Sequence, residues 1–266
     1  MLEYFDYSFF RYAIVGVALI SLCAATIGTY IISRRMVAIS GGITHACFGG
    51  LGLGYYLGIS PVLTAAVFAV ASALGVDWLS GRLRVREDSA IAVVWALGMA
   101  AGVLFVFMTP GYVPELNSFL FGNILTVSGS DLVVFGAYAL VLGGFFAWQY
   151  RNIVAVAFDR DFAQVSGLPV RMVSTVMTVL TAVCIVLTIR LVGIMLLMSM
   201  LSLPIITAEI FLHRFSSVMT AAGIISLVCS LTGLFLSTVI DVPCSALIVL
   251  TMVATFALGR VAARWS

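Results

Sequence analysis

Long apolar runs without a charged residue recur along this chain, and they limit its fold more than any other feature. Each run has about 18 or more residues, the length that an α-helix needs to cross a lipid bilayer. The runs do not alternate between polar and apolar residues as the strands of a membrane barrel do. Because 63% of the residues are hydrophobic and only 9% are charged, an ordinary water-soluble domain is excluded. The sequence therefore predicts an all-α, polytopic membrane protein with a single transmembrane domain over residues 1–266.

The apolar runs predict nine membrane spans, within a range of eight to ten. We expect them at about residues 12–32, 36–57, 61–79, 89–109, 132–150, 172–189, 191–208, 215–238 and 242–259. Only Arg190 and Gly193 separate the sixth and seventh runs, which form either a tight hairpin or one long element with a break. With nine spans and an external N-terminus, only Arg11 and Arg190 lie outside, so 11 of the 13 basic residues are cytoplasmic. The positive-inside rule therefore favours the hairpin and a cytoplasmic C-terminus.

The basic residues are all arginine, and the chain contains no lysine. A Walker A loop needs a lysine to reach the nucleotide phosphates, so this chain does not hydrolyse ATP through a P-loop of its own. An intramembrane enzyme is also disfavoured, since there are only two histidines and no serine in a Gly-x-Ser-x-Gly elbow. The five cysteines lie in apolar segments without the paired spacing of a metal knuckle, which is typical of small buried residues. We therefore expect a protein that is not itself an enzyme.

His45 is the most informative single residue in the apolar runs. It follows Arg35 by ten positions, which places it roughly 15 Å deep in a hydrocarbon core about 30 Å thick. A polar side chain at that depth requires a partner or a cavity, and imidazole suits zinc and other transition metals. The two interpretations are a metal ligand and a histidine hydrogen-bonded to a neighbouring helix. Small residues at intervals of four form a seam beside it for close helix packing, at Ala46, Gly50, Gly54 and Gly58.

The polar loop 151–171 is cytoplasmic in this topology. Residues 155–166 (AVAFDRDFAQVS) have the pattern of a short amphipathic helix, which Gly167 ends and Pro169 prevents from continuing. Its two sides consist of Phe158, Phe162 and Val165, and of Asp159, Arg160, Asp161 and Gln164. The segment fits either a helix on the membrane surface or a docking helix for a cytoplasmic partner.

The seventh predicted span contains a proline and ends near two polar residues. Pro204 removes a backbone hydrogen bond, so we expect a helix break there. Glu209 and His213 lie one helical turn apart, a spacing that suits a metal ion. Because His213 precedes Arg214 at the predicted cytoplasmic boundary, a solvated pair is the preferred interpretation.

Five ordered stretches resemble one family, the bacterial ABC permeases for uptake of zinc, manganese or iron(II). The Arg34-Arg35-Met36 triplet and the stretch around His45 are similar to the second transmembrane region of that family. The other four stretches are the Leu-Phe-Gly segment 116–125, the coupling-helix region 158–170, the proline-containing helix 192–208, and the turn 241–246. The resemblance covers nearly the whole chain.

The resemblance implies a type II ABC importer-like permease in the bacterial cytoplasmic membrane that works by alternating access. Two copies of the chain, or one copy with a paralogue, would form the pore within the lipid bilayer. An extracytoplasmic metal-binding protein would deliver a divalent metal ion as substrate, most simply zinc. Two ATPase subunits would bind and hydrolyse ATP. We expect no nucleic-acid partner. The residues that would couple the ATPases to the pore are Asp159, Arg160, Asp161, Phe162 and Gly167.

One position departs from the family pattern. The family usually has an aspartate four residues before the histidine, and this chain has Gly41 there. An aspartate and a histidine one turn apart would offer an oxygen and a nitrogen to the same cation. A site without the carboxylate shifts away from manganese and towards zinc or a softer ion, or binds the cation weakly. Glu115, next to the Leu-Phe-Gly segment, is either a carboxylate at the external mouth of the pore or a solvated loop acid.

Two other transporter classes remain as alternatives. A type II ABC permease for a metal chelate, such as cobalamin or a siderophore, would share the docking loop but usually has about ten spans and a longer chain. An ion-coupled secondary transporter often shows inverted repeats and paired intramembrane acids. Neither feature is evident here, because the acids near the spans lie at their ends.

Overall fold

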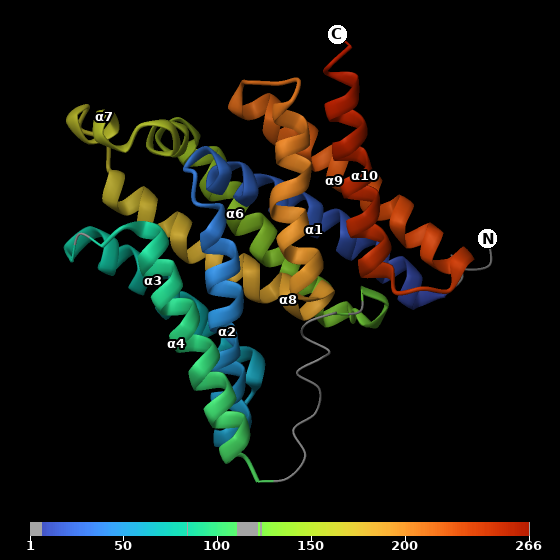
Figure 1. Cartoon of the computed structure of the whole chain (residues 1–266), viewed down its shortest axis with the longest axis horizontal. Coiled ribbons are helices and arrows are strands. Elements are labelled where there is room, and N and C mark those ends of the chain that lie inside the picture. The colour runs from blue at the N-terminus through green and yellow to red at the C-terminus, as the bar shows by residue number, and fades with distance from the viewer. Residues whose placement is uncertain (1–6, 84, 111–121, 123, 266) are drawn as a thin grey trace. The chain divides into compact units, whose positions relative to one another are not determined.

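The computed structural model of the chain describes residues 7–83, 85–110, 122 and 124–265 (Figure 1). Its α-helices are α1 (Ser8–Ser33), α2 (Val37–Leu57), α3 (Pro61–Arg82), α4 (Glu87–Met108), α6 (Gly129–Phe158), α7 (Arg160–Val165), α8 (Val170–Glu209), α9 (Phe215–Ile240) and α10 (Cys244–Ala262). A 3₁₀ turn, η2 (Ile124–Thr126), precedes α6. Within the described ranges there is no strand, so the predicted all-α fold is confirmed.

Eight helices in the described part of the chain are long and apolar enough to cross a membrane. This number lies within the predicted range, and the helices coincide with the expected apolar runs. The difference from nine arises at α8, which covers the sixth and seventh runs as one element of 40 residues. A straight helix of that length would measure about 60 Å, twice the thickness of the hydrocarbon core. Gly193, with φ 78° and ψ 172°, interrupts it, and this backbone conformation is open only to glycine.

The expected break at Pro204 is wrong, because α8 continues through that residue to Glu209. Membrane helices tolerate proline where neighbouring groups satisfy the backbone atoms that it leaves unpaired. Pro204 is buried among packed side chains, and its missing N–H removes only one helical hydrogen bond, the one to the Met200 carbonyl. The interruption is therefore at Gly193. A methyl group at Gly122, in the Leu-Phe-Gly segment, would collide with the backbone of Val192 and Gly193.

The chain divides into two compact units. The first consists of Met1–Ile32, Asn117–Tyr150 and Leu191–Ser266. Its α1 and α9 are joined by a 3.1 Å hydrogen bond from the Ser226 hydroxyl to the Ser21 hydroxyl. Small apolar side chains from α1, α8 and α9 form its tightest cluster, with Ala25, Ile205, Ala208, Val218 and Ala222.

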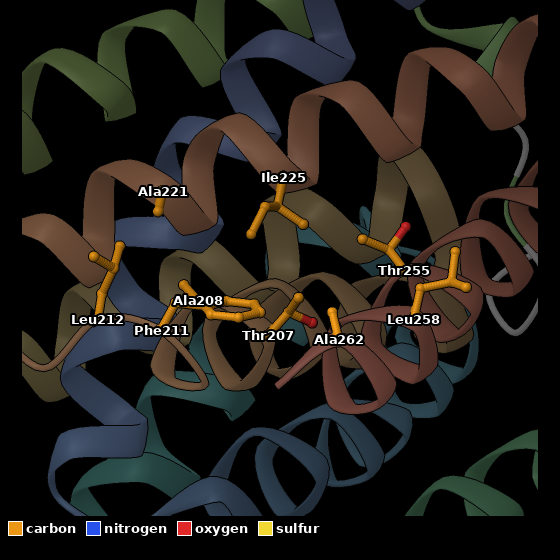
Figure 2. Close-up of a pocket in the computed structure, with 10 residues that line it drawn as sticks. Thr207, Ala208, Phe211, Leu212, Ala221, Ile225, Thr255, Leu258 and Ala262 are labelled. Atoms are coloured by element: carbon orange, nitrogen blue, oxygen red, sulfur yellow. The ribbon is translucent and has the colours of Figure 1, made fainter. Parts of the chain in front are cut away.

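A cavity of about 420 Å³ in the first unit lies between the end of α8, α9 and α10 (Figure 2). Figure 2 shows aliphatic and aromatic side chains around it, with Phe211 and Leu212 near one end and Leu258 near the other. Its two threonines donate hydrogen bonds from their hydroxyl groups to backbone carbonyls of their own helices, Thr207 to Leu203 and Thr255 to Thr251, and the Thr255 hydroxyl also lies 3.3 Å from the Cys229 thiol of α9. This cavity offers apolar contact and is not a metal site.

The second unit consists of Ser33–Leu116 and Arg151–Arg190. Helices α2, α3 and α4 pack side by side in it (Figure 1). Small residues allow the backbones to approach closely: a Cβ atom at Gly52 would lie 2.6 Å from the carbonyl oxygen of Gly102. The close packing of these helices therefore depends on glycine residues at the points of contact.

We expect Gly98→Ala to destabilise the second unit, because the added methyl group would collide with the backbone of Ala46 on α2. Overpacking of this kind costs about 1–3 kcal/mol. Gly75→Ala on α3 is the matched control, since nothing lies within 4 Å of the position of its added methyl group. That change should be neutral or stabilising, because alanine is the better helix former. Thermal unfolding of the purified variants in detergent measures both effects, and equal shifts in the two would contradict the prediction.

Candidate functional site

The site begins with the packing of α2, the helix that carries His45. A Cβ atom at Gly50 would lie 2.6 Å from the Thr64 carbonyl oxygen, and one at Gly54 would collide with the Thr64 hydroxyl. Ala46 lies against Gly98 of α4. The small-residue seam thus lies at contacts with both neighbouring helices. Gly58 differs from the expectation, because nothing lies within 4 Å of the position of its Cβ; with φ 67°, it caps α2 instead of packing.

His45 is half-buried, and its ring stacks on the indole of Trp95 of α4. The ring centroids are 4.5 Å apart and the rings are parallel. The Nδ1 atom of His45 is buried and has no hydrogen-bond partner among the described residues. The alternative of a histidine hydrogen-bonded through Nδ1 to a neighbouring helix is thus not what the structure shows. A buried nitrogen without a hydrogen-bond partner costs roughly 1–3 kcal/mol, and a ligand that bound to Nδ1 would remove this cost.

The surroundings of His45 hold few other metal ligands. Gly41, one turn before it, is buried and contributes no side chain, and Cys47 is buried two positions later. In the part of the chain that the structure describes, no group of three or more histidine, cysteine, aspartate or glutamate side chains is arranged to hold a metal. Glu115 lies outside the described residues, so its role stays a prediction. His45 is therefore a lone candidate ligand among the described residues, and a cation there would need further ligands from water or from another part of the transporter.

The start of α2 is held by Arg34, whose side chain is only 8% exposed. Its guanidinium lies 3.8 Å from the Glu87 carboxylate at the start of α4 and donates a 3.3 Å hydrogen bond to the Ser174 hydroxyl of α8. Arg34 thereby connects three helices of the second unit. The Arg34-Arg35-Met36 triplet does not by itself reveal this role of Arg34; the acid in the first turn of α4, Glu87, is the sequence signal for its partner.

The predicted helix 155–166 is two helices rather than one. Asp159 has extended backbone angles and separates the end of α6 from α7. Its carboxylate accepts a 2.8 Å hydrogen bond from the Phe162 backbone N–H, which is a helix N-cap. Asp159 thus has a structural role that the amphipathic pattern did not reveal.

Helix α7 ends as the sequence predicted and presents apolar side chains. Gly167, with φ 75°, follows its C-cap, and the Leu168 N–H donates a 3.1 Å hydrogen bond to the Ala163 carbonyl. Phe162 is 65% exposed and Val165 is 90% exposed, while Arg160 and Asp161 are also exposed. A short, capped helix with uncovered apolar side chains has the form of a docking element.

These observations define a helical, multi-pass membrane protein with a histidine in a close-packed helix and a short exposed helix between its spans. The profile of the ABC 3 transport family matches residues 6–263, and the chain belongs to this family.

Individual relatives agree over nearly the whole length. The chain is 34% identical to the "Probable metal transport system membrane protein" of Chlamydia pneumoniae, over 87% of this chain and 81% of the relative. It is 31% identical to the "Manganese transport system membrane protein MntC" of Halalkalibacterium halodurans, over 96% and 87%. The fold is similar to a chain of PsaBC from Streptococcus pneumoniae, solved in complex with Fab, with a TM-score of 0.84 and 24% identity over 97% and 94% of the two chains.

Proposed function

We propose that this chain is the membrane-spanning permease subunit of an ABC transporter that imports a divalent transition-metal ion. The observation that carries the proposal is His45, a half-buried imidazole with an unpaired Nδ1 atom on a close-packed membrane helix. The printed names of the relatives support a metal cargo, because they describe metal and manganese transport. Membership of an ABC transport family argues against the ion-coupled secondary transporter.

Zinc is the first candidate for the cargo, with manganese and iron(II) as the alternatives. The names of the relatives favour manganese, whereas the residues near His45 favour zinc. Gly41 removes the carboxylate oxygen that manganese prefers, and imidazole nitrogen binds zinc more readily. Zinc is placed first because the residues near His45 belong to this chain, whereas the names describe other proteins.

The work of the transporter is divided between subunits in this proposal. The chain has no lysine, so ATP is bound and hydrolysed on separate cytoplasmic ATPase subunits that dock on α7. A second copy of the chain or a paralogue completes the pore, and an extracytoplasmic metal-binding protein delivers the ion. The complex lies in the bacterial cytoplasmic membrane with the C-terminus inside, as the arginine distribution predicts.

Metal uptake by cells that carry the complete transporter tests the proposal directly. Zinc, manganese and iron(II) are each supplied as radioactive ions, with radioactive cobalamin as the chelate alternative. We expect uptake of at least one of the free ions, dependent on ATP, and no uptake of cobalamin. Uptake of cobalamin alone would reject the metal-ion cargo, and purification of an active transporter without an ATPase subunit would reject the ABC mechanism.

Gly41→Asp should shift the selectivity towards manganese. An aspartate one helical turn before His45 would place a carboxylate oxygen beside the imidazole nitrogen. We expect the ratio of manganese to zinc uptake to rise by roughly tenfold, which corresponds to about 1.4 kcal/mol. Competition uptake with both ions measures the ratio. Gly41→Ala is the steric control, and a similar shift in that variant would show that the carboxylate is not responsible.

A further inference from the structure

A second cavity lies in the second unit; none of its lining residues is on α2, which carries His45, and one side of it is formed by α7. It has a volume of about 1090 Å³, at the upper end of the roughly 300–1,000 Å³ of small-molecule sites. The end of α3, the helix α7, the loop that follows it and the first turns of α8 line this cavity. Residues far apart in the sequence therefore line one cavity, at the end of α3 and the start of α8.

Three arginines from three helices line the cavity. Arg82 is the last residue of α3, Arg160 the first of α7, and Arg171 the second of α8. Within the described residues, none of these guanidinium groups has an ion-pair or hydrogen-bond partner. Asp77 is the one acid in the lining, so the formal charge is +2 (three positive, one negative). Its carboxylate accepts a 2.9 Å hydrogen bond from the Thr178 hydroxyl and forms no ion pair with these arginines among the described residues, so the excess positive charge is open to an anion from outside the chain.

The lining changes from charged to apolar along both membrane helices. On α3, Arg82 is followed towards the membrane interior by Trp78 and then Leu74, about 12 Å away along the axis. On α8, the lining runs from Arg171 through Met172, Ser174 and Thr175 to Val176, a rise of about 7.5 Å. Trp78 is 53% exposed, and a tryptophan in this position is typical of the membrane interface. The cavity therefore offers cations where the two membrane helices end, and beyond them large apolar side chains together with Asp77 and two hydroxyl groups, those of Ser174 and Thr175.

We propose that this cavity binds an anionic phospholipid, with its phosphodiester between Arg82 and Arg171 and the start of its acyl chains against Trp78 and Leu74. Guanidinium groups bind phosphate oxygens through paired hydrogen bonds, and basic pockets at the ends of membrane helices suit lipid headgroups. A soluble anion would use only the charged end of the cavity. An acidic segment of a partner protein would leave the apolar end, on the membrane side of the arginines, unfilled.

Lipid binding to the purified full-length chain, together with any subunit that co-purifies, tests the proposal. Native mass spectrometry follows titration with phosphatidylglycerol and, separately, with phosphatidylcholine. We expect tighter binding of phosphatidylglycerol, weakened about fivefold in either Arg82→Gln or Arg171→Gln, since each basic residue near a membrane surface contributes about that factor. Arg82→Lys should retain most of the affinity for phosphatidylglycerol. That result would show that the glutamine variants bind more weakly because the positive charge is lost, and not because the protein is misfolded.

Arg86→Gln is the matched control, because Arg86 lies four residues after Arg82, just before α4, but does not line the cavity. Equal weakening in that variant would overturn the proposal in favour of a general surface charge. Equal affinity for the two lipids would overturn it as well. Displacement of phosphatidylglycerol by millimolar glycerol 3-phosphate or inorganic phosphate would identify a site for a free phosphate instead. Loss of a co-purifying subunit in Arg82→Gln, without any change in lipid binding, would identify a protein contact.

Discussion

His45→Ala is expected to abolish metal uptake while the transporter still assembles. His45 is the only histidine in α2, so its loss removes the proposed ligand from the proposed ion path. The fold should tolerate the change, because the Nδ1 atom has no hydrogen bond to lose among the described residues. Loss of the ring stack with Trp95 costs only about 0.5–1.5 kcal/mol.

The total metal content of cells grown in zinc-limited medium measures this effect, and the yield of the purified complex measures assembly. We expect uptake to fall at least tenfold, to the level of cells that lack the transporter. His213→Ala is the matched control, since His213 is the other histidine of the chain and lies exposed in the segment after α8. Normal uptake by the His45→Ala variant would remove His45 from the ion path.

The membrane spans could be predicted from the sequence because one strong physical requirement determines them. A backbone in hydrocarbon must satisfy its own hydrogen bonds, so each long apolar run becomes a helix despite its glycines. Helix α2 is an example, with six glycines between Gly41 and Gly54 that would weaken a helix in water. The interruption of α8 at Gly193 agrees with the short gap expected between the sixth and seventh runs, whereas the additional break expected at Pro204 does not occur, because the sequence does not show how the surroundings accommodate a proline.

The details of the candidate site could be predicted only in part. The position of His45 follows from counting along the helix, but its stack on Trp95 depends on how α2 packs against α4. That packing is set by contacts such as Ala46 with Gly98, which are 52 positions apart and leave no periodic signal. The separation of α6 from α7 was missed because Asp159 fits the polar side of one continuous helix as well as it fits an N-cap.

Changes in α7 are expected to uncouple ATP hydrolysis from transport. The structure shows which side chains of α7 are exposed and which interactions hold the helix itself in place, so the two can be changed separately. Phe162→Asp removes an exposed apolar side chain but keeps the backbone N–H that Asp159 caps. If the ATPase docks on this side chain, a carboxylate there should reduce co-purification of the ATPase at least tenfold, about the loss that one central contact residue causes. Uptake should fall in parallel, while the yield of the permease itself stays unchanged.

Gly167→Val tests the same element through its backbone. With φ 75°, the glycine adopts a left-handed conformation that costs a β-branched residue about 1–2 kcal/mol, and no atom lies near enough to add a steric clash. Gly167→Asn is the matched control, because asparagine tolerates this conformation. We expect the valine variant to hydrolyse ATP without transport and the asparagine variant to remain coupled. If ATPase activity and its stimulation are unchanged in Phe162→Asp and in Gly167→Val, the ATPase does not dock on α7, and the energy of hydrolysis reaches the pore by another surface.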